Sequence, residues 1–273
     1  DGNLYGLTDL GGANSKGTAF RMTPDGTFTK LLDFNGSNGA NPDGRLTQDA
    51  AGDFWCMTSA GGTGGFGTIF RMTSEGVLAT LVSFDDADKG KFPRGSLVDG
   101  GDGNFYGLTS AGGANGGGTA FRVASDGTFE KLADFASGAS PRGDFLKHTD
   151  GHFYGTTSGG GDNSLGSLFR LEPNAVEGMR LTILASFDGG GLGKEPFGSL
   201  IDQGAGDLIG VTQRGGANDK GAVFKFNVTG GVMNKLADFD GTGNGASPTG
   251  DFLDASDVGY GNSERFYGLA SAG

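Results

Sequence analysis

The chain of 273 residues is poor in several residue types, and each scarcity excludes a class of protein. A single cysteine, Cys56, excludes an intrachain disulfide, and with only two histidines it leaves little for a transition-metal site. Seven prolines beside 58 glycines exclude collagen and a proline-rich linker. No apolar run approaches the ~18 residues that a membrane-spanning helix needs, so we expect no membrane span in this segment.

Positive charge is also scarce. The chain has 20 Lys and Arg against 32 Asp and Glu, and its net charge is −12. Binding to nucleic acid or to an anionic membrane surface needs clustered Lys and Arg, so the composition argues against both partners. Acidic surfaces are common on exported proteins, and they can bind cations.

Glycine and phenylalanine are abundant instead. Gly accounts for 58 residues, about three times its ordinary usage, and Phe for 22. This combination indicates many turns that join short strands around a shared core. No stretch shows an apolar period of 3.6 residues, so we expect almost no helix. The fold class is therefore predicted to be all-β.

These residues recur in phase. A Gly pair follows a short aromatic run in each copy, and two Phe positions recur after it, which is typical of repeat architectures. The copies are approximately residues 1–41, 42–92, 93–140, 141–195 and 196–247, with a partial copy at 248–273. The first Gly of the pair falls at Gly11, Gly61, Gly112, Gly160, Gly215 and Gly273.

Each copy divides into four strand-like runs, which in the third copy are residues 95–98, 104–109, 118–123 and 128–135. The last two runs are joined through Asp126-Gly127, and Asp-Gly is a strong hairpin signal because Gly accepts a positive φ. Four antiparallel strands per repeat predict a β-propeller of four-stranded blades, as a single domain over residues 1–273. A β-solenoid or a β-sandwich is the weaker alternative.

The blade count is predicted to be five, with closure by the C-terminal strand around residues 250–253; six or more blades is the alternative. Five blades leave residues 265–269 redundant with residues 3–7. The surplus strand could be displaced, could pair with another molecule by β-augmentation, or could belong to a larger propeller. Head-to-tail pairing between molecules would build a filament.

The repeat contains runs such as Asn104-Phe105-Tyr106-Gly107 and Gly118-Thr119-Ala120-Phe121-Arg122, followed by Asp126-Gly127-Thr128. It resembles the Gly-rich GloVer repeat, named for Gloeobacter and Verrucomicrobia, over essentially the whole chain. The fourth and fifth copies depart from the pattern, for example at Leu208-Ile209-Gly210. The resemblance implies an exported, surface-associated bacterial protein and no known catalytic residues. The chain does not begin with Met, so we expect a segment of a longer polypeptide.

The predicted strand order places the long Gly, Asn and Asp-rich loops on one face, and the short turns on the other. Loops carry function more often than strands, so a ligand is expected on the long-loop face. Arg94 and Arg142, just after the loop prolines, are the main polar candidates. The further candidates on this face are Asn38, Asn115, Asn163 and Asn218.

Other chemistry has weaker support in the sequence. Asp85, Asp86 and Asp88 form the densest carboxylate cluster, which is a weak candidate for Ca²⁺; no other cofactor is expected. The two histidines, His148 and His152, flank the Asp150-Gly151 turn on the short-turn face, away from the expected ligand. No nucleophile–base pair is evident, so we expect no enzyme activity.

These observations predict a non-enzymatic repeat protein, extracellular or on the cell surface, with a structural, adhesive or filament-forming role. The alternative is a lectin-like propeller that binds carbohydrate through the long-loop face, where near-equivalent sites would give avidity. The expected partners are other copies of the chain or a surface polysaccharide.

Overall fold

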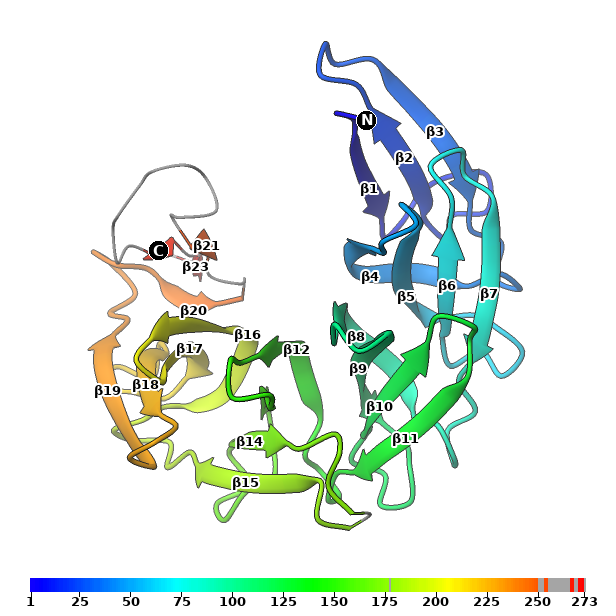
Figure 1. Ribbon diagram of the computed structural model, residues 1–273. Coiled ribbons are helices and arrows are strands. Elements are labelled where there is room, and N and C mark those ends of the chain that lie inside the picture. The colour runs from blue at the N-terminus through cyan, green and yellow to red at the C-terminus, as the bar shows by residue number, and fades with distance from the viewer. Residues whose placement is uncertain (177, 250–252, 255–265, 268–269, 273) are drawn as a thin grey trace. The chain divides into compact units, whose positions relative to one another are not determined.

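In the computed structural model, the described residues are 1–176, 178–249, 253–254, 266–267 and 270–272, and their regular elements are all β-strands (Figure 1). None of these residues is helical, which confirms the predicted all-β class. The chain divides into two compact units, Asp1–Phe135 and Ala136–Gly273, and each is described by itself. The prediction of a single domain therefore stays a prediction.

The first unit contains three antiparallel sheets whose strands follow one another in chain order. The first sheet has three strands and the other two have four each. The strands are β1 (Leu4–Thr8), β2 (Thr18–Met22), β3 (Phe28–Asp33), β4 (Ala40–Gln48), β5 (Phe54–Ala60), β6 (Thr68–Met72), β7 (Leu78–Ser83), β8 (Lys91–Asp99), β9 (Asn104–Ala111), β10 (Thr119–Ala124) and β11 (Phe129–Asp134).

The second unit contains two four-stranded sheets of the same order, followed by two short strand pairs in which β20 pairs with β23 and β21 with β22. The strands are β12 (Pro141–Lys147), β13 (Phe153–Thr157), β14 (Ser167–Leu171), β15 (Leu181–Ser186), β16 (Lys194–Gly204), β17 (Asp207–Arg214), β18 (Ala222–Asn227), β19 (Val232–Asp238), β20 (Ala246–Pro248), β21 (Leu253–Asp254), β22 (Phe266–Tyr267) and β23 (Ala270–Ala272).

The strands of the third copy confirm the sequence prediction, with one difference. The first strand, β8, begins at Lys91 and includes Pro93, so it is longer than the predicted run of residues 95–98. Pro93 pairs with Thr109, and the register then shifts between Arg94 and Val98. The strand therefore continues through the proline by means of a bulge, which the sequence pattern did not reveal.

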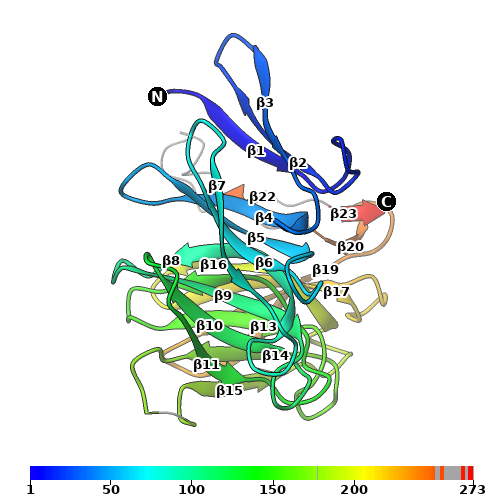
Figure 2. The same ribbon diagram turned by 90° about the vertical axis from the view of Figure 1, so that its right-hand side faces the viewer.

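The Gly of each Pro-x-Gly motif lets the first strands of neighbouring sheets approach closely. In the first unit, where Figure 2 shows β4 and β8, a Cβ on Gly44 would lie 2.2 Å from the carbonyl oxygen of Gly95. In the second unit a Cβ on Gly143 would lie 2.4 Å from the carbonyl oxygen of Gly198. A hydroxyl joins each pair of strands, because Ser96 Oγ accepts from Arg45 N at 2.8 Å and Ser199 Oγ from Asp144 N at 2.9 Å.

The recurring aromatic residues form the core between sheets of one unit. The rings of Trp55 and Phe105 stack with centroids 4.5 Å apart, and those of Tyr5 and Phe54 lie 4.3 Å apart. The aromatic residue before the recurring Gly position of the second strand is buried at Trp55, Tyr106 and Tyr154, so these rings serve packing. The recurring Phe at the end of the fourth strand is fully buried in four copies: Phe34, Phe84, Phe135 and Phe187.

The predicted closure concerns residues that lie mostly outside the described part of the chain, namely 250–252 and 255–265. Of the surplus strand, Phe266 and Tyr267 pair with Asp254 and Leu253. Further on, Ala270 and Ala272 pair with Pro248 and Ala246. The C-terminal run thus pairs as the second strand of its own repeat.

Candidate functional site

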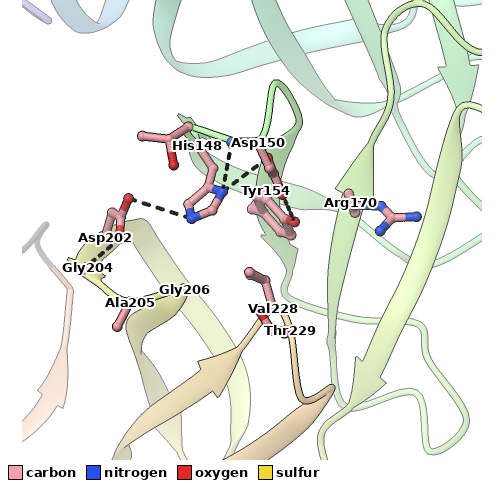
Figure 3. Close-up of a pocket in the computed structure, with 11 residues that line it drawn as sticks. His148, Asp150, Tyr154, Arg170, Asp202, Gly204, Ala205, Gly206, Val228 and Thr229 are labelled. Carbon is pink, nitrogen blue, oxygen red and sulfur yellow. Dashed lines mark hydrogen bonds and ion pairs between the residues drawn. The ribbon is translucent and has the colours of Figure 1, made fainter.

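A polar cavity of about 440 Å³ opens in the second unit at the short turns that follow β12, β16 and β18 (Figure 3). We call it the His148 pocket. By the antiparallel order of the strands, these turns lie at the opposite end of the sheets from the long Gly-rich loops. The lining residues are His148, Thr149, Asp150, Tyr154, Arg170, Asp202, Gly204, Ala205, Gly206, Val228 and Thr229.

The β12–β13 turn places His148 at this cavity. The backbone N–H of His148 donates to the carbonyl of His152 at 3.0 Å, and that of Gly151 donates to the carbonyl of His148 at 3.1 Å. Gly151 has a φ of +84°, a conformation that the tight turn requires and that glycine adopts without strain. The predicted Asp150-Gly151 turn is therefore confirmed.

His148 lies between two carboxylates from neighbouring sheets. Its Nδ1 is 3.0 Å from Oδ1 of Asp150, and its Nε2 is 3.7 Å from Oδ2 of Asp202. The imidazole packs edge-on against the Tyr154 ring, with centroids 5.6 Å apart and planes at 82°, and only 8% of the side chain is exposed. This histidine therefore links the turn after β12 to the turn after β16.

Asp150 is held as a carboxylate by the groups around it. Burial by itself would raise its pKa, but hydrogen bonds from the backbone N–H of His152 at 2.9 Å and the Tyr154 hydroxyl at 2.7 Å outweigh it and lower the pKa well below the ordinary range. The same burial and the same Asp150 contact raise the pKa of Tyr154. Tyr154 is therefore a neutral hydrogen-bond donor, and Asp150 is an acceptor.

The remaining polar groups supply acceptors and donors on the other walls. Oδ1 of Asp202 accepts from the backbone N–H of Gly204 at 2.8 Å, which orients its carboxylate. Arg170 pairs with Glu172, and its buried Nε has no hydrogen-bond partner among the described residues. A pocket that mixes carboxylate acceptors with an Arg donor suits a hydroxyl-rich ligand better than a simple ion.

A second cavity, of about 400 Å³, lies at the corresponding place in the first unit, and we call it the Asp49 pocket. It opens at the turns after β4, β8 and β10, which are the counterparts of those that form the His148 pocket. It is more apolar. The lining residues are Asp49, Ala50, Ala51, Asp99, Gly101, Gly103, Phe105 and Ser125.

The two pockets share a pair of carboxylates. Asp49 accepts from Trp55 Nε1 at 2.8 Å, as Asp150 accepts from the Tyr154 hydroxyl. Oδ1 of Asp99 accepts from the N–H of Gly101 at 2.7 Å, as Asp202 does from that of Gly204. Burial would raise the pKa of Asp49, but the Trp55 bond and two backbone N–H groups lower it. In each unit, the described residues therefore form a pocket with two oriented carboxylates.

The two arginines predicted to face a ligand contact residues of neighbouring strands. Arg94 Nη1 lies 3.1 Å from Oδ2 of Asp43, joining β8 to β4. The Arg142 guanidinium lies 5.9 Å from the centroid of the Phe197 ring, joining β12 to β16. Both arginines are exposed, so their role toward a ligand stays a prediction.

The predicted asparagines lie in separate loops, and three of them hold their own loops in place. Asn38 Nδ2 donates to the carbonyl of Asp33 at 3.4 Å. Asn163 and Asn218 donate to the carbonyls that follow β15 and β19, those of Phe187 and Phe239, at 3.0 and 3.1 Å. Asn115 is exposed at the tip of its loop.

The Gly-rich loops also pack against the next sheet. A Cβ on Gly17 would lie 2.7 Å from Pro42 Cδ, and one on Gly166 would lie 2.4 Å from Pro196 Cδ. The backbone N–H before each proline donates into the same loop, for example from Asn41 to the Lys16 carbonyl at 2.9 Å. The long loops therefore serve as joints between sheets, which explains their glycines.

In the acidic cluster of Asp85, Asp86 and Asp88, the carboxylates of Asp85 and Asp86 are paired with groups nearby in the chain. Oδ1 of Asp85 accepts from the backbone N–H of Asp88 at 3.1 Å, and its other oxygen pairs with Lys89. Asp86 pairs with Lys91 at 2.9 Å. In the described part of the chain, no group of three or more His, Cys, Asp or Glu residues is arranged to hold a metal ion.

The described residues also contain no helix of the length and apolarity that a membrane crossing needs.

Sequence reasoning missed Tyr154, Arg170 and Asp202 as site residues. A signal exists, because an Asp stands four residues before the Tyr in three copies. The three pairs are Asp1–Tyr5, Asp102–Tyr106 and Asp150–Tyr154, and each is hydrogen-bonded.

The family model described as the Gloeobacter/Verrucomicrobia repeat matches residues 1–146 and 136–273. No curated protein matches the chain.

Several solved structures have a similar fold. A "putative 6-phosphogluconolactonase" from Bacteroides fragilis is 19% identical, with a TM-score of 0.63, over 99% of this chain and 75% of that one. A GH74 xyloglucanase from Xanthomonas campestris is 16% identical, with a TM-score of 0.59, over 86% and 36%. The extracellular domain of a one-component system from B. thetaiotaomicron is 13% identical, with a TM-score of 0.56, over 92% and 30%. At these identities the likeness extends to the propeller-like fold alone.

Proposed function

The chain belongs to the Gloeobacter/Verrucomicrobia repeat family, and from this premise we propose that it is a non-enzymatic, extracellular repeat protein with an adhesive role at the cell surface. The observation that carries the proposal is the recurrence of one pocket type in both units. A chain with several similar weak sites binds a repetitive ligand tightly through avidity, which is what adhesion requires.

A surface polysaccharide is the ligand that suits these pockets. Carboxylates that are oriented by backbone N–H groups, such as Asp99 and Asp202, accept hydrogen bonds from sugar hydroxyls. Arg170 adds donors in the His148 pocket, and Ala50 and Ala51 add apolar surface in the Asp49 pocket. The lectin-like alternative is therefore retained, with the pockets between neighbouring sheets in place of the long-loop face.

The state of the polar groups supports binding rather than catalysis. The low pKa of Asp150 and the raised pKa of Tyr154 make both poor groups for proton transfer near neutral pH. In the hydrogen bonds of the described residues, neither His148 nor His152 activates a Ser, Thr or Cys side chain.

The number of blades is part of the proposal. Closure of five blades would require the strand near residues 250–253 to pair with β1. The pairing of β21 with β22 and of β20 with β23 instead supports the alternative of six or more blades. Images of single particles of the intact chain would count the blades, and a closed five-bladed ring would favour the first arrangement.

A glycan array with the intact chain tests the adhesive function. We expect binding to an extended polysaccharide, and we expect Asp202→Asn to weaken it. Asn115→Ala, at the tip of a long loop, is the matched control and should bind as the wild type does. Loss of binding in Asn115→Ala but not in Asp202→Asn would place the ligand on the long-loop face, and no binding to any glycan would contradict the proposal.

A further inference from the structure

The last strand of the three-stranded sheet and of each four-stranded sheet is an edge strand, with one hydrogen-bonded neighbour in the described part of the chain. Edge strands carry unpaired backbone groups that can pair with another chain, and soluble proteins protect them with bulges and with charged residues, especially Lys. Each of these five strands has a bulge at the same place. The five edge strands are β3, β7, β11, β15 and β19.

Three of these edges also carry charge. In each of them a Lys at the centre of the strand forms an ion pair with the Asp three residues later. The Nζ–Oδ2 distances are 2.7 Å for Lys30–Asp33, 2.8 Å for Lys131–Asp134 and 2.6 Å for Lys235–Asp238.

Strand β15 lacks this ion pair, although the residue at its Asp position still binds the Gly-rich loop. Ile183 stands at the Lys position and Ser186 at the Asp position. In β11, Oδ1 of Asp134 also accepts the N–H of Ala114 in the Gly-rich loop, at 2.8 Å. In β15, Oγ of Ser186 accepts the corresponding N–H of Asp162 at 3.0 Å. The loop is thus still held, and only the charge at the edge is gone.

The β15 edge is consequently apolar and uncharged. The strand Leu181–Ser186 contains no ionisable side chain, and Ile183 is 49% exposed. In β7 the Lys position holds a polar residue, Thr80, so β15 is the one of the five edges with an exposed apolar residue there. β-Branched and apolar residues without charge favour strand pairing.

We propose that β15 is a self-association edge, which pairs antiparallel with β15 of a second copy of this chain. A strand that pairs antiparallel with its own copy is self-complementary, so the contact closes on a two-fold axis. The chain has a net charge of −12, and strand β15 carries no carboxylate that would repel the same strand of a second copy. The bulge at Leu184 limits the ladder to a few residues, so the association is reversible. The inference is independent of the two pockets.

Sedimentation velocity of the intact chain over a range of concentrations tests this edge. We expect a reversible monomer–dimer equilibrium for the wild type. Ile183→Lys introduces the Lys that three of the other edges carry at this position and should raise the dissociation constant by about tenfold or more. Val232→Lys is the matched control, since Val232 is a 52% exposed residue on the protected edge β19 of the same unit; it should dimerise as the wild type does.

The reciprocal variant Thr80→Ile places an apolar residue at the same position of β7, a strand without ionisable side chains, and should add a second association edge, so that species larger than dimers appear. A wild-type chain that stays monomeric at every concentration would overturn the proposal. So would equal weakening by Ile183→Lys and Val232→Lys, because it would trace the effect to net charge. Circular dichroism of each variant shows whether the fold is retained, and polysaccharide binding by Ile183→Lys should equal that of the wild type.

Discussion

The hydroxyl of Tyr154 donates a 2.7 Å hydrogen bond to Oδ2 of Asp150, four residues earlier in the chain. Tyr106 makes the same bond to Asp102 at 2.8 Å. In the fifth copy both partners are replaced together, by Ile209 and Ala205. The pair is therefore a unit of the repeat scaffold, and the His148 pocket is built upon it by adding a histidine and the carboxylate of the next sheet.

The Tyr106–Asp102 bond should contribute measurably to stability. Tyr106 is buried, and burial together with the Asp102 contact raises its pKa to about 12, so it stays protonated and donates its hydrogen bond to a charged acceptor at all ordinary pH values. We expect Tyr106→Phe to lower the free energy of unfolding by about 1–2 kcal/mol in urea denaturation. Tyr5→Phe, whose bond to Asp1 is exposed, should cost less. Equal costs for the two variants would contradict this assignment.

The same carboxylates predict a loss of stability in acid. Burial would raise the pKa of Asp102, but hydrogen bonds from Tyr106 and Asn104 lower it below 3.8, and Asp49 and Asp150 are lowered as well. The unfolded chain therefore takes up protons first as the pH falls, and the stability is lost between the ordinary Asp value and the lower folded value. Urea unfolding from pH 7 to pH 2 should show this loss. Asp102→Asn should make the free energy of unfolding depend less on pH. A variant with the same pH dependence as the wild type would contradict the role of Asp102.

A glycine of the second strand should tolerate no side chain. A Cβ on Gly107 would lie 2.5 Å from Cζ of Phe121 and 3.0 Å from Cδ2 of Leu97, so one of these buried residues would have to move. We expect Gly107→Ala to destabilise the protein by about 1–3 kcal/mol, as overpacking does. Gly190→Ala, where no atom lies within 4 Å, should be nearly neutral in the same thermal unfolding measurement. A destabilising Gly190→Ala beside a neutral Gly107→Ala would reverse this interpretation.

Cys56 offers a probe of the sheet β4–β7. Its side chain is a fully buried thiol outside any disulfide, so it should react with a thiol reagent only when this sheet opens. The labelling rate should rise steeply with denaturant and follow the unfolding of the first unit. Rapid labelling under native conditions would show that the sheet opens locally without global unfolding.

The repeats, the strands and the hairpin turns could be predicted from the sequence because they rest on local signals. The short strand-like runs, Asp126-Gly127 and the recurring Phe positions all act within one copy. The long first strand was not foreseen, since a proline in a strand is compatible with pairing only through the bulge that follows Pro93.

The site depends on contacts between copies, which a single repeat does not encode. Asp150 and Asp202 are 52 residues apart and meet only because two sheets pack side by side, with Pro-x-Gly strands in close contact. The Gly, Asn and Asp content of the long loops led to the prediction of a ligand on their face. Their glycines, however, serve to join sheets, as Gly17 does, and their asparagines hold the loops in place, as Asn163 does. The Asp that recurs four residues before the Tyr indicates the position of the pocket better than the loop composition does.

Binding of the intact chain to an immobilised polysaccharide, compared with binding to a short oligosaccharide in solution, tests the proposed adhesion most directly. The measurement uses the wild type, Asp202→Asn, Asp99→Asn and the double variant. If both pockets bind, each single variant loses the avidity for the immobilised ligand, a drop of about 10²-fold or more, while its affinity for the short ligand falls far less. Single variants that bind the immobilised polysaccharide as tightly as the wild type would contradict multivalent binding through these pockets.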